Sequence, residues 1–347
     1  MEVPSIFLNK ILAEAAKRNA SSLHLTIGNL PAIRVNGQLL AMDEESMITV
    51  EMVDKIINSF VSEDEKAALA ENRELVLVKN FSGNFRFRVN IFYQKNLPSL
   101  SFHYISETIK SLSELKLPPI FNNLLKMKSG LFVIAGSYGS GKTTTVASFI
   151  EEINKNYKRR IITIEDPIEN LFVSKKSLIE QREVGRDVKS AVEGLAYCLE
   201  EDVDLVCAGR IKNNFESAMP LVLDLAAGNT LVILEIKAEN SIGAVDKILN
   251  ALKKRSATEA AQHNLADVLV GVMTQKLVPR VGGGMVLAPE VLIATSAVKS
   301  LIREGRIYQL ESIIQTGRKD GMISMAKSLD ELLRTGEIKQ EDSGANV

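Results

Sequence analysis

The feature that most constrains the fold of this chain is a glycine-rich segment between an apolar run and a helical pattern. Gly136 to Thr143 reads GSYGSGKT, directly after LFVIA and directly before TTVASFIEEIN. The segment fits the G-x-x-x-x-G-K-[ST] template in the strand, loop and helix setting that a phosphate-binding loop requires. Glycines are needed because backbone N–H groups must turn inward around phosphate oxygens, which demands positive φ and space in place of a Cβ. The segment therefore predicts a P-loop.

The side chains of this loop predict the ligands that it holds. Lys142 is expected to reach the β and γ phosphates of a nucleotide, and Thr143 is expected to ligate Mg²⁺. The N-terminus of the following helix adds its dipole to the phosphate site. The predicted cofactors are ATP and Mg²⁺, and the residues predicted to bind them are Gly136, Gly139, Ser140, Gly141, Lys142, Thr143 and Thr144.

The pattern around the P-loop predicts an α/β domain. Short apolar runs at 131–135, 161–164, 205–208 and 231–234 are separated by helical patterns. Continuous apolar runs that alternate with helices indicate a mainly parallel sheet that is covered on both faces. From about residue 240 onward the pattern is largely helical, with one glycine-rich turn, VGGGM, between two predicted strands.

The first hundred residues have a different pattern. Ser62 and Glu65 form a capping-box sequence at the start of EDEKAALAEN, and Asn36-Gly37 is a hairpin turn signal. From Phe85 to Tyr93 the residues alternate, which predicts a half-buried strand with Arg86 and Arg88 on its polar face. These features predict a separate α+β domain.

A chain of 347 residues has room for about two domains. The stretch SETIKSLSELKLPP is polar and ends in two prolines, which is typical of a linker. We place the N-terminal domain at 1–105, the linker at 106–118 and the P-loop domain at 119–338. The tail at 339–347 is predicted to be disordered.

Composition argues against several classes of protein. Lys and Arg total 42 against 43 Asp and Glu, so no basic field predicts binding to nucleic acid. The most apolar stretch, 218–236, is interrupted by Pro220, Asp224 and Gly228, which predicts a helix, a turn and a buried strand and not a membrane span. The N-terminus lacks a signal peptide's uninterrupted apolar run, and two cysteines cannot form a disulfide scaffold. A cytoplasmic protein is expected.

Several longer segments resemble one ATPase family. IITIEDPIE at 161–169 resembles the Asp box of type IV pilus and type II secretion ATPases, and EQREVGRD at 180–187 is similar to the segment that follows it in PilT-like proteins. SSLHLTIGNLPAIRVNGQL resembles the family's N-terminal domain, although Ser22 stands where Asp is usual. FRFRVNIFYQ at 85–94 is similar to the arginine-bearing strand, and SAVKSLIREGR at 296–306 resembles a motif of the retraction branch. The resemblance covers about residues 5 to 338.

The resemblance implies a PAS-like N-terminal domain, a RecA-like P-loop domain and a twitching-motility motor that retracts type IV pili. It implies a hexameric ring of this chain or paralogous ATPase subunits at the cytoplasmic face of the inner membrane, with a pilus platform protein as partner. Arg86 and Arg88 would reach phosphates at an interdomain or intersubunit site. Glu165 and Asp166 would face the Mg²⁺ and water side. The alternatives are two solvated arginines and a pair of carboxylates that cap the next helix.

The chain departs from this family at the Walker B strand. The family usually reads like DPDVILVGEMRD, but residues 202–213 read DVDLVCAGRIKN. Arg210 thus stands where the family has its catalytic glutamate, and Asn213 stands where it has Asp. Glu235, near the end of the neighbouring strand, is a possible substitute without a counterpart in the family.

The family's two-histidine box is also missing. GNTLVILEIKA from residue 228 places Asn229 or Thr230 near the first position and Lys237 near the second. The chain has three histidines, His24, His103 and His263, so no realignment restores the box. These histidines and the two cysteines are expected to be structural.

Two hypotheses follow for the chemistry. In the first, the chain is a nucleotide-binding paralogue with weak or lost hydrolysis, because the P-loop is intact while the Walker B strand and histidine box are altered. In the second, it is an active motor with a rearranged catalytic set. A small-molecule P-loop kinase has no support from the flanking segments.

Overall fold

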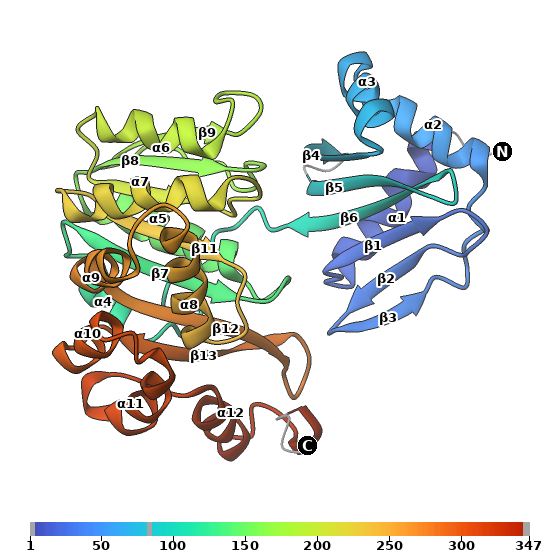
Figure 1. The fold of residues 1–347 in the computed structure, drawn as a ribbon. Helices are drawn as coiled ribbons and strands as arrows, with labels where there is room; N and C mark the ends of the chain where they lie inside the picture. The colour runs from blue at the N-terminus through green and yellow to red at the C-terminus, as the bar shows by residue number, and fades with distance from the viewer. Residues whose placement is uncertain (1–3, 82–84, 343–347) are drawn as a thin grey trace. The chain divides into compact units, whose positions relative to one another are not determined.

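The computed structural model describes residues 4–81 and 85–342 of the chain (Figure 1). The chain divides into two compact units, made mainly of residues 1–108 and 109–347. The first is called the N-terminal unit and the second the C-terminal unit. Residues 340–342, inside the predicted tail, form a 3₁₀ turn, and residues 343–347 lie outside the described part.

The N-terminal unit is an antiparallel sheet of six strands in the order β3-β2-β1-β6-β5-β4. Helix residues such as Ile11 and Val53 pack with strand residues such as Leu25, Val89 and Phe102 in one apolar core. The strands are β1 (Ser22–Thr26), β2 (Ala32–Val35), β3 (Gln38–Ala41), β4 (Glu74–Phe81), β5 (Phe85–Gln94) and β6 (Leu97–Ile105), and the helices are α1 (Pro4–Lys17), α2 (Val50–Phe60) and α3 (Glu63–Asn72).

Local sequence signals explain the ends of these elements. Asn36 and Gly37 join β2 to β3 with φ of 48° and 84°, and two positive φ angles are what a tight hairpin turn requires. At the start of α3, the Glu65 N–H donates to Ser62 Oγ at 3.3 Å, and the Ser62 N–H donates to Glu65 Oε2 at 2.8 Å. The predicted hairpin and capping box are confirmed.

The C-terminal unit has a sheet of seven strands in the order β13-β12-β7-β11-β10-β8-β9. All neighbours are parallel except β12 and β13, which are antiparallel. The P-loop strand β7 lies inside the sheet, between β12 and β11. The strands are β7 (Gly130–Gly136), β8 (Arg160–Glu165), β9 (Leu178–Glu183), β10 (Leu205–Ala208), β11 (Leu231–Ile236), β12 (Leu269–Pro279) and β13 (Met285–Ile293).

Helices cover both faces of this sheet (Figure 1). On β7, Leu131 and Val133 face one apolar core, while Phe132 and Ile134 face another that contains Phe149 of α5. Burial on both faces explains why these strands read as continuous apolar runs. The helices are α4 (Ile120–Leu124), α5 (Lys142–Asn156), α6 (Ala191–Leu199), α7 (Phe215–Ala227), α8 (Ser241–Lys253), α9 (Thr258–Val268), α10 (Ser296–Arg303), α11 (Leu310–Thr316) and α12 (Met325–Arg334), with 3₁₀ turns at Ile307–Gln309, Gly317–Asp320 and Gln340–Asp342.

The apolar stretch 218–236 is divided between α7, which contains Pro220, and the buried strand β11. In the described ranges, 4–81 and 85–342, no helix combines the length and apolarity needed to cross a membrane. The predicted division into helix, turn and strand is confirmed.

Candidate nucleotide-binding site

The P-loop leaves the end of β7 and enters α5 in a conformation that requires its glycines. Gly136, Gly139 and Gly141 have φ of 148°, 74° and 86°, in the region that favours glycine. A Cβ on Gly136 would lie 2.4 Å from Ser140 Oγ and 2.7 Å from the Gln275 carbonyl oxygen. The loop therefore needs glycine at its first position for both conformation and space.

The N-terminus of α5 is open toward the loop. Its N-cap is Gly141, which offers no side chain to accept hydrogen bonds from the first turn. Those N–H groups and the helix dipole form an anion-binding arrangement. Thr144, in the same turn, is exposed, and its carbonyl accepts from Ser148 Oγ at 2.9 Å.

Lys142 is folded back onto the loop. Its Nζ donates to the carbonyl oxygens of Gly136 at 3.1 Å and Ser137 at 2.7 Å. Burial lowers the pKa of Lys142, Glu235 raises it, and the positive charges of Arg210 and Lys237 lower it further. The ammonium group thus lies inside the loop, where phosphate oxygens would replace carbonyl oxygens as its partners.

Glu235 is a carboxylate that contacts the P-loop. It lies on β11, which separates the P-loop strand β7 from β10 in the sheet, and its side chain accepts from Thr143 Oγ1 at 3.4 Å. Only 8% of the residue is exposed. Burial raises the pKa of Glu235 to about 7, whereas Lys142 and the Thr143 hydrogen bond lower it. The sequence feature that could identify Glu235 as a site residue is its position as the one acidic residue in an otherwise apolar strand.

Glu165, at the end of β8, lies near the same place. Its Oε1 accepts from Thr163 Oγ1 at 2.6 Å and from Gln181 Nε2 at 3.1 Å, and burial raises the pKa of its carboxyl. Glu165, Glu235 and Thr143 border one cavity of about 20 Å³. A cavity of that size has room for about one water molecule. Two carboxylates therefore converge beside the predicted Mg²⁺ ligand.

Asp166 is oriented differently from Glu165. Its Oδ1 accepts from Lys212 Nζ at 2.8 Å in a half-buried ion pair. Lys212 follows β10, and sequence reasoning did not identify it as a partner because nothing in the local pattern connects the two segments. The structure therefore pairs Asp166 with a lysine, and its predicted role beside Mg²⁺ stays a prediction.

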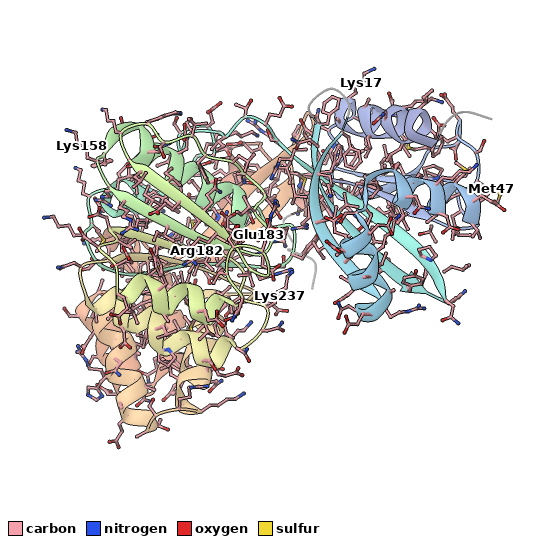
Figure 2. All side chains as sticks on the ribbon, turned by 90° about the horizontal axis from the view of Figure 1, so that it is seen from above. Lys17, Met47, Lys158, Arg182, Glu183 and Lys237 are labelled. Carbon is pink, nitrogen blue, oxygen red and sulfur yellow. The ribbon has the colours of Figure 1, made fainter. Side chains whose placement is uncertain are left out.

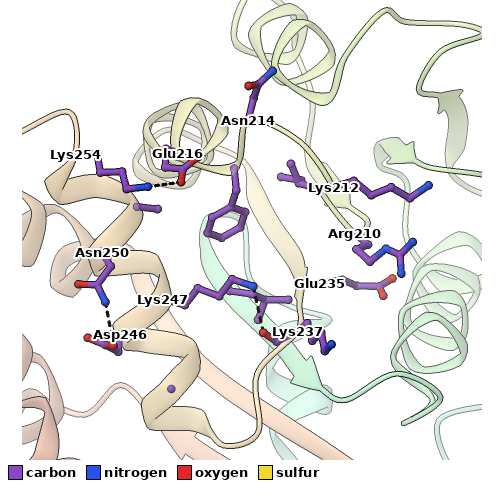
Figure 3. A pocket seen from close by; sticks show the side chains of 15 residues that line it. Arg210, Lys212, Asn214, Glu216, Glu235, Lys237, Asp246, Lys247, Asn250 and Lys254 are labelled. Carbon is purple, nitrogen blue, oxygen red and sulfur yellow. Dashed lines mark hydrogen bonds and ion pairs between the residues drawn. The ribbon is translucent and has the colours of Figure 1, made fainter. Parts of the chain in front are cut away.

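A second, larger cavity adjoins Glu235 and carries basic side chains. Its volume is about 700 Å³, and Figure 3 shows Arg210, Glu235 and Lys237 gathered at one end of it. Arg210 follows β10 and Lys237, labelled in Figure 2, follows β11, and both residues are exposed. Arg210 and Lys237 thus bring positive charge to the edge of the site.

Of the other residues singled out in the sequence, Cys207 borders the small cavity together with Thr143, Glu165 and Glu235. His24, His103 and His263 lie on β1, β6 and α9, and Cys198 and Cys207 are buried. Arg86 and Arg88 lie on β5 of the N-terminal unit, where Arg86 Nη1 donates to Asn80 Oδ1 at 3.2 Å and Arg88 is opposite His103. Contact of these arginines with a nucleotide stays a prediction.

The residues present fit ATP and Mg²⁺. The loop forms a phosphate cradle in which a Cβ on Gly136 would clash, with the Lys142 ammonium inside it and the Thr143 hydroxyl beside it. In the described part of the chain, no three His, Cys, Asp or Glu side chains form a metal-binding group. Mg²⁺ is usually held by one or two protein oxygens together with waters and phosphates, and the Thr143 hydroxyl and the Glu235 carboxylate lie together at this site.

A P-loop on an inner strand of a mainly parallel sheet, with carboxylates on β11 and β8 of the same sheet, defines a RecA-like nucleotide-binding domain. More particularly, the chain belongs to the family of type II/IV secretion system proteins, whose model matches residues 2–334. The predicted family and α/β class are confirmed.

Comparison with individual proteins places the chain near the pilus retraction branch. It is 35% identical over 312 residues to the twitching motility protein of Neisseria gonorrhoeae, covering 90% of this chain and 82% of that protein. It is 31% identical over 336 residues to the type IV pilus retraction ATPase PilT of Pseudomonas aeruginosa, covering 97% and 96%. The solved structure of the pilus retraction motor PilT with bound ADP has a TM-score of 0.81 and 33% identity, covering 97% and 96%.

The raised pKa of Glu235 predicts a pH-dependent stability of the ligand-free C-terminal unit. Between pH 4.5 and about 7 the folded unit holds a proton on Glu235 that the unfolded chain has released, so the free energy of unfolding falls as pH rises. Glu235→Gln removes this titration. As the pH rises from 4.5 to 8, the free energy of unfolding of the variant should increase by roughly 3 kcal/mol relative to that of wild type.

Denaturant unfolding of both proteins at several pH values, without nucleotide, measures this difference. Burial lowers the pKa of His103 to about 4, so that residue makes stability rise between about pH 4 and 6.5. His103 is common to both proteins, and its contribution cancels in the comparison. A difference that does not change with pH would contradict the prediction.

Proposed function

We propose that this chain is an ATP-binding subunit of a type IV pilus retraction motor. The observation that carries the proposal is the P-loop geometry, in a chain 31% identical to a pilus retraction ATPase over 97% of its length. By the same likeness, it assembles with itself or with paralogous ATPase subunits as a hexameric ring. The ring would lie at the cytoplasmic face of the inner membrane and act on the pilus platform protein.

In this proposal the chain's own residues bind and orient the nucleotide. The loop amides and the first turn of α5 donate to phosphate oxygens, and Lys142 exchanges the carbonyls of Gly136 and Ser137 for phosphate. Thr143 supplies a hydroxyl ligand to Mg²⁺, which when bound neutralises part of the phosphate charge. Arg86 and Arg88 are proposed as further phosphate ligands, from the same or a neighbouring subunit.

Hydrolysis by this chain alone is proposed to be slow. Arg210 follows β10, where the sequence resemblance implies that the family has its catalytic glutamate, and a guanidinium does not accept a proton from water. Loss of a positioned general base typically lowers the rate by about 10² to 10⁴. The positive charges of Arg210 and Lys237, which lower the pKa of Lys142, instead favour retention of the anionic phosphates.

A second candidate function is a fully active motor, and the position of Glu165 favours it. Its carboxylate borders the same small cavity as Thr143, and its pKa is raised by burial, which makes it a better proton acceptor at neutral pH. Fast ATP cleavage by wild type that disappears in Glu165→Gln would establish this second function in place of the first.

The motor role is testable in the organism that carries this chain. Deletion of the gene should abolish pilus retraction, observed as labelled pili that extend without withdrawing. Wild type and Lys158→Ala, which changes an exposed lysine of the same unit (Figure 2), should restore retraction, and Lys142→Ala should not. Normal retraction in the deletion strain, or restoration by Lys142→Ala, would contradict the proposal.

A further inference from the structure

Glu235 is an unusual residue for its position. The other five residues of β11, from Leu231 to Ile236, are apolar and buried. Burial of a carboxylate destabilises the folded state by several kcal/mol unless a partner compensates for the lost hydration. The carboxylate therefore needs a local partner, and the partners that it has are on the P-loop.

The sheet places this carboxylate at the edge where the P-loop begins. Glu235 pairs with Ile134 on β7, and the preceding residue, Leu234, pairs with the last residue of β10. Glu235 thus extends just beyond the end of β10, at the carboxyl ends of the strands, where parallel α/β sheets bind their ligands. Its Oε2 accepts from Thr143 Oγ1 at 3.4 Å.

The neighbouring carboxylates have other partners. Asp166 is paired with Lys212, and Glu165 accepts from Thr163 and Gln181. Among the described residues, Glu235 is the acidic side chain with a hydrogen bond to Thr143. In P-loop proteins the Mg²⁺ ion is held by the loop Ser or Thr together with an acidic residue at the end of a nearby strand.

We propose that Glu235 is the positioning carboxylate that, together with Thr143, fixes the Mg²⁺ of the bound nucleotide. In this proposal the acidic residue that helps to hold the metal lies on β11, because Arg210 follows the end of β10. The cavity of about 20 Å³ that Glu235, Glu165 and Thr143 border has room for about one water molecule beside this carboxylate. This inference rests on the proposed ATP binding. It implies that the chain keeps Mg²⁺ binding, through Glu235 and Thr143, although Arg210 cannot activate the attacking water.

The test measures nucleotide affinity and metal binding, and it does not depend on turnover. A fluorescent ATP analogue is titrated into wild type, Glu235→Gln and Glu290→Gln, first with EDTA and then with increasing Mg²⁺. Glu290 is a matched control because it is also a buried glutamate, with 9% of the residue exposed. It lies on β13, and its carboxylate accepts from the backbone N–H of Ser241 at 2.7 Å. Electron paramagnetic resonance with Mn²⁺ then counts the bound metal directly.

We expect the Mg²⁺ concentration that half-saturates the nucleotide complex to rise about 10- to 100-fold in Glu235→Gln, as is typical when a residue that orients a metal ligand is lost. The affinity without metal should stay within about twofold of wild type, since the phosphate contacts remain. Glu290→Gln should match wild type in both buffers. If Glu235→Gln does not fold, Glu235→Asp should show at least a severalfold rise, because the shorter side chain withdraws from Thr143.

Two outcomes would contradict this inference, and a third would contradict the proposed function on which it rests. An unchanged Mg²⁺ dependence in the folded variant would overturn the inference. An equal loss of affinity with and without metal would also overturn it, because Glu235 would then act through Lys142 and not through the metal. Failure of wild type to bind the analogue in either buffer would instead refute the proposed function.

Discussion

Replacement of Lys142 by alanine is expected to reduce the affinity for ATP by about 100-fold or more. The ammonium group is held inside the loop by the carbonyls of Gly136 and Ser137, where phosphate oxygens would lie. Loss of two charge-assisted hydrogen bonds at about 1.5 kcal/mol each corresponds to this factor. Its partners are two carbonyls and the Ser140 hydroxyl of the loop itself, so the fold should persist.

Isothermal titration with ATP and Mg²⁺ measures the effect, and circular dichroism confirms folding. Lys158→Ala is the matched control, because it removes the same charge from an exposed position of the same unit. The control should bind ATP as wild type does. Equal affinity in Lys142→Ala and wild type would show that the P-loop assignment is wrong.

Exchange of Arg210 for glutamate is expected to accelerate ATP cleavage about tenfold or more. The substitution restores a group that can orient or deprotonate water at the end of β10. It also removes a positive charge that lowers the pKa of Lys142. The gain should be partial, because Asn229 and Lys237 do not supply what the family's histidines supply, and because Glu165 and Glu235 already place negative charge nearby.

Residues that act as a unit are strongly non-additive. Histidine at positions 229 and 237 should therefore increase cleavage only when Arg210 has been changed to glutamate. Single-turnover measurements on wild type, Arg210→Glu, the histidine pair and the triple variant separate these contributions. If wild type cleaves ATP fast and the rate falls in Arg210→Glu, this arginine takes part in catalysis. The proposal that Arg210 slows hydrolysis would then be wrong.

The elements that were predictable from sequence are those with local causes. The glycines of the P-loop, the capping box at Ser62 and the Asn36-Gly37 turn each act within a few residues, and the structure has them where expected. The parallel strands could also be predicted from their apolar runs, because strands that are buried on both faces contain few polar residues.

The arrangement of the site was less predictable, because it depends on strand order. The placement of β11 between β7 and β10 brings Glu235 to Thr143, 92 positions earlier in the chain. The ion pair of Lys212 with Asp166 likewise joins loops after two adjacent strands. No local pattern encodes these tertiary contacts, although one acidic residue within LVILEI was a sign that β11 has a polar partner.

The most direct test of the central claim is to measure ATP binding and ATP turnover on one preparation of the wild-type protein. We predict saturable, Mg²⁺-dependent binding of one nucleotide per chain, with single-turnover cleavage about 10² to 10⁴ slower than in a relative that keeps the Walker B glutamate. The absence of saturable binding, with folding confirmed, would contradict the account.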